Sequence, residues 1–316
     1  NSSQLIDNRI ITKGSYSNAL YLFGSSTANL SLNNITTYGD SAYGIATSRA
    51  NASIISLNNI TTYGDRATGF VSYLGFNNIL KENNIATYGT YGHGTVLASS
   101  FNTSFFNTSI LTANSNSIGI GLTENSSSSF ESVSVKTIHN DLAYSFYIEL
   151  GYHDISFRDG LLKASYNSDI FIDPLTQGGE WNFTNVSFTD RTRSAGANGT
   201  LNVHWYLDLN VTNKQGLAVE NASVNISNVY NVSIGIFNTL QNGYIPRQTL
   251  IEYSENRTDT IFFTNYMIKV SKDGFADKIV SLNLTNSTQL NIVLNVLPQV
   301  TQIFPIDGKK IDIEKQ

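Results

Sequence analysis

The chain of 316 residues contains no cysteine and only four prolines, and charged side chains make up 14% of it. Without cysteine there can be no disulfide framework. The net charge of −5 comes without a basic cluster, which excludes the electrostatic signature of a nucleic-acid-binding protein. The sequence also has no run of 18 apolar residues, so it predicts no membrane-spanning helix.

What the chain does contain is a repeat of about 25 residues along its first 190 residues. The clearest copies are NNITTYGDSAYGI, NNITTYGDRATGF and NNIATYGTYGHGT, which begin at Asn33, Asn58 and Asn83. Apolar or small residues recur at this interval in three columns: Leu30, Ile55, Leu80, Phe105, Phe130, Ile155; then Ile11, Ile35, Ile60, Ile85, Ile110, Val135; then Ile45, Phe70, Thr95, Ile120, Ser145, Ile170. Such a period indicates a stacked repeat architecture.

Each copy holds three short β-like runs separated by Gly, Asn, Ser or Asp. This period is too short for four-stranded propeller blades and lacks the helices of ankyrin or tetratricopeptide units. Three strands per rung, stacked at about 4.8 Å, make a parallel β-helix in which each apolar column becomes an inward ladder. The sequence therefore predicts an all-β chain with a right-handed parallel β-helix of about seven rungs over residues 1–194.

The period stops near Gly196, and the second half of the chain has a different pattern. Residues 195–200 are the expected linker. After them, alternating strands flank the turns at Asn213–Gly216 and Lys272–Gly274, which predicts a small β-sandwich over residues 201–297. Residues 298–316 follow as a linker with a strand of another domain.

The string WYLDLNVTNKQGLAVENASVNI, with YMIKVSKDGF after it, resembles the carboxypeptidase-regulatory-like (transthyretin-like) sandwich. Leu217-Ala218-Val219 stands where that family has Pro-Val. The first half resembles the pectin-lyase-like β-helices, especially NosD-like repeats, and the pairing resembles archaeal S-layer and surface-filament proteins. The resemblance implies a fold and an exported location more than an activity, since the sandwich family supplies no catalytic residues.

The 38 Asn and 67 Ser plus Thr residues would form about 8 Asn-x-Ser/Thr acceptor motifs by chance, whereas 18 are present. This excess predicts N-glycosylation and hence export, although solenoid turns favouring both residue types would explain part of it. Asn34 and Asn59 share one turn position, where glycans about 4.8 Å apart would crowd each other, so we expect them in amide ladders beside Asn33, Asn58, Asn83 and Asn84. The expected glycan sites are Asn29, Asn51, Asn102, Asn107, Asn125, Asn182, Asn185, Asn198, Asn210, Asn221, Asn225, Asn231, Asn256, Asn283 and Asn286.

Asp40 and Asp65 occupy the same repeat position, beside Arg66, and are the main candidates for an enzymatic or calcium site. Pectin-lyase-like enzymes include lyases that use Asp-bound calcium and hydrolases that use clustered Asp. Stacked carboxylates raise one another's pKa or bind a cation, but an Asp after Gly is also a common turn residue. We favour the turn, and so expect no catalytic residue and no cofactor beyond a structural calcium ion.

Other polar residues give weaker signals. His93, His139, His153 and His204 share no repeat position, which argues against a metal cluster. Asp154, Asp159, Asp169 and Asp173 lie near the last rungs, where we expect capping loops or an incidental calcium site rather than a catalytic pair. Tyr38, Tyr63 and Tyr88 form an aromatic column that could stack on sugar rings or simply stabilise the rungs; we favour the second interpretation.

The ends of the chain suggest assembly. No secretion signal opens the sequence, and an incomplete first repeat is explained by a processed or truncated N-terminus. The C-terminal segment IFPIDGKKI resembles the start of a fibronectin- or immunoglobulin-like sandwich, which is either cut short or donated as a strand to a neighbour.

Together these patterns predict an extracellular, N-glycosylated structural protein at the cell surface. It would be a subunit of a surface layer, sheath or filament that assembles with itself through strand edges and the C-terminal strand. A glycan-binding adhesin and a polysaccharide lyase or glycoside hydrolase are the alternatives.

Overall fold

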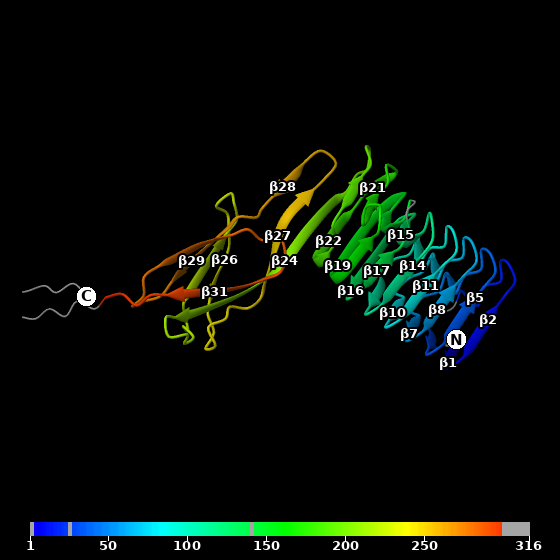
Figure 1. The fold of residues 1–316 in the computed structure, drawn as a ribbon, viewed down its shortest axis with the longest axis horizontal. Coiled ribbons are helices and arrows are strands. Elements are labelled where there is room, and N and C mark those ends of the chain that lie inside the picture. The colour runs from blue at the N-terminus through cyan, green and yellow to red at the C-terminus, as the bar shows by residue number, and fades with distance from the viewer. Residues whose placement is uncertain (1–2, 25–26, 140–141, 299–316) are drawn as a thin grey trace, which may run out of the picture. The chain divides into compact units, whose positions relative to one another are not determined.

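The computed structural model describes residues 3–24, 27–139 and 142–298, and within these ranges the chain forms strands and turns but no helix. It divides into two compact units (Figure 1). The first consists of Asn1–His204 with Tyr253–Ile261, and the second of Trp205–Glu252 with Phe262–Gln316. The segments expected at 298–316 lie almost entirely outside the described residues.

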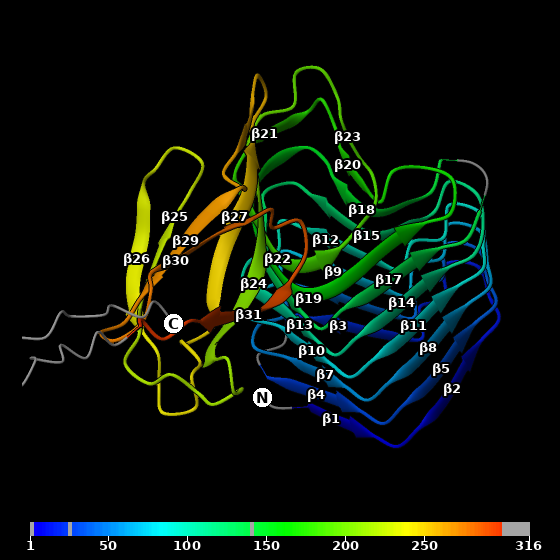
Figure 2. The same cartoon turned by 60° about the vertical axis from the view of Figure 1, so that its left-hand side comes forward.

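The first unit is a parallel β-solenoid, which confirms the predicted fold. Figure 2 shows its three columns of parallel strands. The first column contains β1 (Ser3–Ile6), β4 (Ala28–Ser31), β7 (Ile54–Ser56), β10 (Ile79–Lys81), β13 (Thr103–Phe106) and β16 (Ser126–Glu131). The second contains β2 (Arg9–Thr12), β5 (Asn34–Thr37), β8 (Asn59–Thr62), β11 (Asn84–Thr87), β14 (Ser109–Thr112) and β17 (Ser134–Thr137).

The third column is a sheet of eight strands in unbroken sequence order. These are β3 (Leu20–Phe23), β6 (Ile45–Ser48), β9 (Phe70–Tyr73), β12 (Thr95–Ala98), β15 (Ile118–Thr123), β18 (Tyr144–Ile148), β20 (Ile170–Ile172) and β23 (Arg191–Arg193). In the seventh rung one long strand, β19 (Gly151–Ala164), serves both the first and second columns. A shorter last rung follows, made by β21 (Thr176–Gly178), β22 (Glu180–Ser187) and β23.

The predicted inward ladders fill the solenoid, with three corrections of register. Ile10, not Ile11, pairs with Ile35, and Ile11 is exposed. Extra residues after β17, within the sixth rung, shift the later columns. As a result Phe157, not Ile155, follows Phe130, and Phe146, not Ser145, follows Ile120. The spacing of 25 residues fails there because the turns lengthen while the strand pairing continues.

Asparagine ladders satisfy the buried turn between the first and second columns. Nδ2 of Asn33 donates to Oδ1 of Asn58 (3.0 Å), and Nδ2 of Asn58 donates to Oδ1 of Asn83 (3.0 Å). All three side chains are buried. Asn34 and Asn59 pair in register on adjacent strands but point outward, and Nδ2 of Asn84 donates to Asn59 (3.1 Å). Amide ladders thus exist at both positions, with the buried one at the first Asn of each pair.

Glycine is required where successive rungs come closest. A Cβ added at Gly64 would lie 2.1 Å from the carbonyl oxygen of Gly39, and one added at Gly89 would lie 1.8 Å from that of Gly64. Neither oxygen can move away, because both belong to the backbone of the rung below. This explains the Gly of the repeated TYG motif.

The segment Tyr253–Ile261 covers the last rung of the solenoid. Glu255 is buried and its carboxylate accepts hydrogen bonds from Nε of Arg191 (2.6 Å) and Nε of Arg193 (3.2 Å). The guanidinium of Arg191 lies over the ring of Tyr253, and that of Arg193 over the ring of Trp181. We call these contacts the C-terminal latch. Residues 195–200, expected as a linker, also hydrogen-bond to the solenoid through Asn198 and Thr200.

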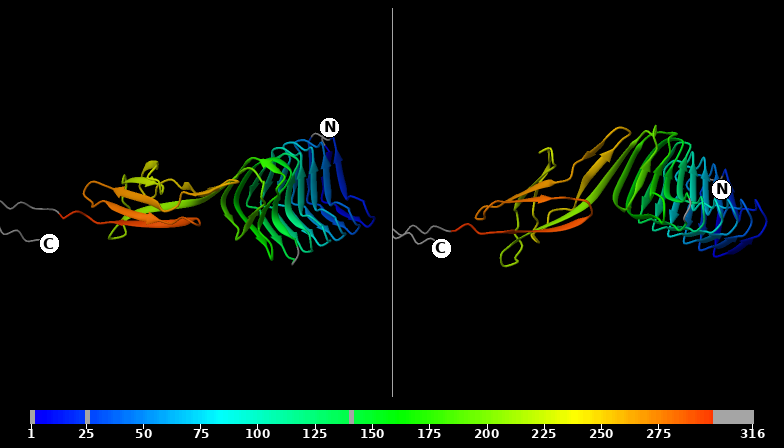
Figure 3. Two further views of the ribbon diagram at one scale, coloured as in Figure 1. Left: turned by 90° about the horizontal axis from the view of Figure 1, so that it is seen from above. Right: turned by 45° about the horizontal axis from the view of Figure 1, so that its top comes forward.

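The second unit is sandwich-like and has its own hydrophobic core. One side is an antiparallel sheet in the order β26 (Ser233–Asn238), β25 (Ser223–Ser227), β29 (Tyr266–Ser271) and β30 (Lys278–Leu282). The other side pairs the end of β24 (Thr200–Asn213) with β31 (Thr288–Leu294) in parallel. β27 (Gln248–Glu255) and β28 (Thr260–Phe262) complete the described strands. Leu209, Val224, Ile268 and Ile292 come from both sides and are fully buried together. Two further views show the antiparallel sheet and β31 (Figure 3).

Candidate functional site

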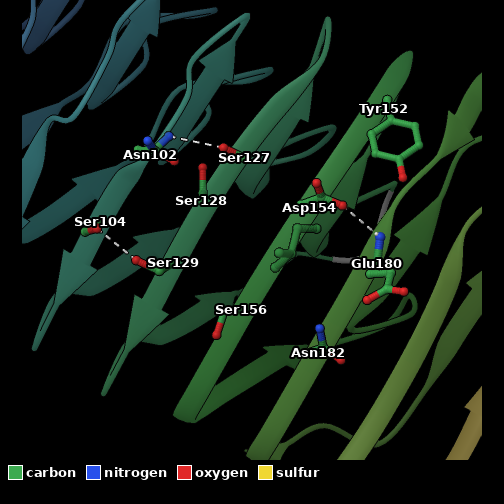
Figure 4. A pocket seen from close by; sticks show the side chains of 11 residues that line it. Asn102, Ser104, Ser127, Ser128, Ser129, Tyr152, Asp154, Ser156, Glu180 and Asn182 are labelled. Atoms are coloured by element: carbon green, nitrogen blue, oxygen red, sulfur yellow. Dashed lines mark hydrogen bonds between the residues drawn. The ribbon is translucent and has the colours of Figure 1, made fainter.

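An open polar groove of about 720 Å³ lies on the outer face of the first column of the solenoid. It crosses β13, β16, β19 and β22, so four successive rungs form it (Figure 4). Its walls and floor are made by outward-facing residues of these strands: Asn102, Ser104, Ser127, Ser129, Tyr152, Asp154, Ser156, Glu180 and Asn182.

The groove exists because small side chains repeat in register. Ser104, Ser129 and Ser156 stand side by side on adjacent strands and are followed by Asn182. The hydroxyl of Ser129 donates to that of Ser104 (2.8 Å). Serine side chains are short, so a row of them leaves a hollow between bulkier residues. The outcome is a floor of hydroxyl groups on a rigid hydrogen-bonded sheet.

Two carboxylates stand in a second row of the same groove. Ser127, Asp154 and Glu180 follow one another on adjacent strands, and Oδ1 of Asp154 accepts the backbone N–H of Glu180 (3.1 Å). Both side chains are exposed. Within the described part of the chain, the Glu180 carboxylate, the Ser156 hydroxyl and the Tyr152 hydroxyl make no hydrogen bond, so they are available to a polar ligand.

Asp40 and Asp65, the predicted candidates, act as turn residues in the structure. Oδ1 of Asp40 accepts the backbone N–H of Asp65 (3.0 Å), and Oδ1 of Asp65 accepts that of Thr90 (2.9 Å). Each carboxylate thus joins its own rung to the next. This arrangement agrees with the turn interpretation that the sequence favoured. Among the described residues no cluster of three His, Asp or Glu side chains is arranged to hold a metal ion.

A second acidic site on the third column was not singled out from the sequence as one cluster. Tyr147 donates to Oδ2 of Asp173 (2.8 Å), and its ring stacks on Phe171 at 5.3 Å. Burial, together with the Asp173 hydrogen bond, raises the pKa of Tyr147 above its ordinary value. Burial, with the charges of Asp173 and Glu124, also raises the pKa of Glu149. The interval between these residues is irregular, which explains why the repeat did not reveal them.

His93 and His153 act as hydrogen-bond acceptors for the backbone of a neighbouring rung. Nδ1 of His93 accepts the backbone N–H of Ile118 (3.1 Å), and Nδ1 of His153 accepts that of Ser126 (3.2 Å). Burial lowers the pKa of His93 to about 4 and also lowers the pKa values of His153 and His204. These three side chains lie at separate points of the solenoid, as their unequal sequence spacing predicted.

The tyrosine column forms as predicted, but its ring faces are occupied. Tyr38 and Tyr63 stack with centroids 5.2 Å apart and an angle of 8°, and Tyr63 and Tyr88 stack at 5.2 Å and 14°. A sugar therefore cannot reach the ring faces between them. This geometry supports the stabilising role and leaves the polar groove as the better place for a carbohydrate.

Acceptor asparagines and buried asparagines form separate sets. The buried ones among the described residues are Asn33, Asn58, Asn78, Asn83 and Asn228, and none of them begins an Asn-x-Ser/Thr motif. The 17 acceptor asparagines that the structure describes are all exposed or half-exposed. Only at Asn185 does the structure show the acceptor nitrogen donating a hydrogen bond, to Asp159 (2.7 Å).

No protein-family model and no curated protein matches the chain. Solved structures give partial likenesses. A minor pilin of Streptococcus agalactiae is 12% identical, with a TM-score of 0.24, over 32% of this chain and 48% of the pilin, so the chain spans about half of that protein. The TIE protein of Bacillus anthracis is 12% identical over 31% of this chain and 18% of its own, with a TM-score of 0.21.

A third likeness covers more of the chain. The tailspike protein gp49 of Pseudomonas phage LKA1 is 7% identical over 82% of this chain and 65% of its own, with a TM-score of 0.20. TM-scores this low support no inference about function. The resemblances to NosD-like and carboxypeptidase-regulatory-like families therefore stay predictions. In the part of the chain that the structure describes, no helix is long and apolar enough to cross a membrane.

Proposed function

We propose that this chain is an extracellular, N-glycosylated structural protein of a cell surface, a subunit of a surface layer, sheath or filament. The observation that carries the proposal is the accessibility of the acceptor asparagines, since every one that the structure describes is exposed or half-exposed. The buried ladder residues lack a Ser or Thr two positions later because that position is an inward core residue, such as Ile60 after Asn58. The 18 acceptor motifs exceed the number expected by chance, and selection for glycan attachment at accessible positions explains this excess.

The solenoid suits a mechanical role. Its inward ladders repeat through seven rungs and its asparagine stack through the four rungs from Asn8 to Asn83, so each rung is supported by its neighbours. Its outward positions include turn ladders, stacked tyrosines and the open groove. Such a unit maintains a fixed spacing without disulfides or metal ions.

Self-assembly is supported by an unprotected strand in the second unit. Among the described strands, β26 stands at the edge of its sheet and pairs with β25 alone, and it contains no charged residue and no proline. Its Ile236 is 68% exposed and Ile234 43% exposed. Edge strands of this kind are templates for pairing with another chain unless charge or proline blocks them.

Electron microscopy of the material purified from its source tests the proposal. We expect ordered polymers, and glycopeptide mass spectrometry should find glycans on the accessible acceptor sites. Ile236→Lys should prevent or weaken assembly, because it places a charge on the edge strand. Met267→Lys is the matched control, since Met267 lies on the central strand β29 of the same sheet and is also exposed. Monomers with no glycan at any acceptor site would refute the proposal.

The predicted role of the C-terminal strand needs a separate test, because residues 299–316 lie outside the described residues. A chain lacking residues 300–316 should assemble poorly if this strand is donated to a neighbour. Normal polymers from the shortened chain would leave β26 as the assembly edge and exclude strand donation.

A glycan-binding adhesin is the second candidate, and the polar groove favours it. Free hydroxyl and carboxylate groups on a rigid surface are suited to sugar hydroxyls. An adhesin would stay monomeric and bind a glycan array, with binding lost in Ser156→Tyr, which fills the groove. Ala86→Tyr, an outward-facing change on β11 of the second column that lies outside every acceptor motif, should leave that binding unchanged.

A further inference from the structure

The groove has an acceptor asparagine at each end. Asn102 begins the motif Asn-Thr-Ser on β13's leading turn, and Asn182 begins Asn-Phe-Thr on β22. Figure 4 shows both side chains at the margins of the same groove, with the serine rows and Asp154 between them. The four rungs stack at strand spacing, so the distance from the first to the last is about 14 Å.

In both asparagines the side-chain nitrogen Nδ2, the atom to which an N-linked glycan is attached, is available. Asn182 accepts a hydrogen bond from Nδ2 of Asn202 (3.0 Å) through its oxygen, and its own Nδ2 donates none within the described residues. The backbone N–H of Asn102 donates to the hydroxyl of Ser127 (3.2 Å), and its side-chain nitrogen likewise donates none there. Asn185 is the contrast, since its Nδ2 is committed to Asp159.

The surface between the two acceptors matches the chemistry of a sugar chain. Asp154 and Glu180 offer carboxylate oxygens to sugar hydroxyls, and Ser156 offers a hydroxyl that can donate or accept. Tyr152 is 53% exposed at the edge of the groove and presents an aromatic ring to the apolar face of a sugar. A glycan attached at either end begins next to these groups, so its local concentration there far exceeds that of any free glycan.

We propose that the groove is the seat of the chain's own N-linked glycans, attached at Asn102 and Asn182 and lying across the rungs between them. The proposal rests on the N-glycosylation proposed above. It reassigns the groove from an external polysaccharide to a covalently attached one. The sugar then covers the strand surface where four rungs meet and stiffens the solenoid from outside.

Mild periodate oxidation of the native glycoprotein tests whether these glycans lie in the groove, because periodate cleaves the vicinal diols of sugars that are exposed to solvent. After a timed reaction, glycopeptide mass spectrometry gives an oxidation rate at each site. Glycans at Asn102 and Asn182 should oxidise roughly tenfold more slowly than those at Asn256 and Asn286, which corresponds to about 1.4 kcal/mol of groove contact. Asn256 and Asn286 are exposed reference sites outside the groove. The rates should become equal in denaturant.

A groove-filling variant made in the source organism completes the test. Ser156→Tyr should displace the sugars and raise the oxidation rates at Asn102 and Asn182 to those of the reference sites. Ala86→Tyr, on an outward position of β11 outside every acceptor motif, should leave all the rates unchanged. Two results would contradict the binding of these glycans in the groove while leaving N-glycosylation itself intact. One is an equal oxidation rate at all four sites of the native protein, and the other is glycosylation of the reference sites without glycans at Asn102 and Asn182. An absence of glycans at every site would overturn the proposed function itself.

Discussion

Asn58 and Asn59 are adjacent in the sequence but have opposite environments, and this difference can be measured. Asn58 is buried; its Nδ2 donates to the carbonyl of Leu30 (2.9 Å) and its Oδ1 accepts the backbone N–H of Asn33 (3.0 Å). Asn58→Ala leaves both backbone groups buried without partners, so it should cost roughly 3 kcal/mol. Asn59→Ala should change stability by less than about 0.5 kcal/mol, because its side chain is exposed. Thermal unfolding of the two variants compares them; similar losses would contradict the buried ladder.

His93 makes solenoid stability depend on pH. Its neutral Nδ1 accepts the N–H of Ile118, and burial lowers its pKa from 6.5 to about 4. The folded state disfavours the protonated form, so this contribution is complete above pH 6.5 and is lost as the pH falls toward 4. The total loss should be about 3 kcal/mol. Asn18 accepts the N–H of Tyr43 at the same repeat position, so His93→Asn should keep the bond and remove this part of the pH dependence. Denaturant unfolding between pH 4 and 7 should show the difference; parallel curves for both proteins would contradict it.

The recurrence of apolar residues in the sequence predicted most of the positions that face the solenoid core. It could do so because burial alternates along each strand and the same positions are buried in successive rungs. The recurrence did not predict backbone conformation at the corners. Leu32, Leu57 and Glu82 have φ between 56° and 59°, although none of these residue types favours the left-handed region. Their N–H groups donate to the next rung, as Leu57 does to Lys81 (2.9 Å). The strain is offset by ladder pairing between rungs, and no local sequence signal marks it.

Among the structural elements, the C-terminal latch provides the clearest test of an ion pair. Glu255 joins Arg191 and Arg193 with its side chain only 12% exposed. Glu255→Gln leaves two partly buried guanidinium groups without a counter-charge, so the solenoid should lose roughly 2 to 3 kcal/mol. The exposed pair Lys81–Glu82 is the control, and Glu82→Gln should cost less than about 1 kcal/mol. Chemical denaturation followed by Trp181 fluorescence measures both, and equal effects would show that the latch contributes no more than a surface pair.

The sequence could not have predicted this latch. Arg191 and Arg193 appear there as part of a polar stretch after the last rung, and Glu255 lies 62 residues beyond Arg193. The repeat relates only residues about one rung apart, so it is silent on a contact that spans so much of the chain. The polar groove was missed for a related reason: Asp154 and Glu180 are 26 residues apart and pair across a rung whose length had changed.

At the scale of the whole molecule, each unit contains one of the two tryptophans. Trp181 is buried in the solenoid, and Trp205 packs against the core of the second unit. Ile60→Ala removes a fully buried side chain from the solenoid and should cost about 2 to 5 kcal/mol there. In the single-tryptophan variants Trp205→Phe and Trp181→Phe, this change should lower the midpoint reported by Trp181 and leave that reported by Trp205 in place. A shift of both midpoints by the same amount would show that the two units unfold together.

The latch also has a consequence for how the protein is made. The solenoid is complete only when Tyr253–Ile261 is in place, yet about half of the second unit, Trp205–Glu252, is synthesised before that segment. On a ribosome, the rungs up to the last can stack as they emerge, while Arg191 and Arg193 wait for Glu255 to be translated. Synthesis proceeds at roughly 5 to 20 residues per second, so this interval lasts several seconds. During it the end of the solenoid is open to contact with another nascent chain, and the order of translation thus determines when that end is closed.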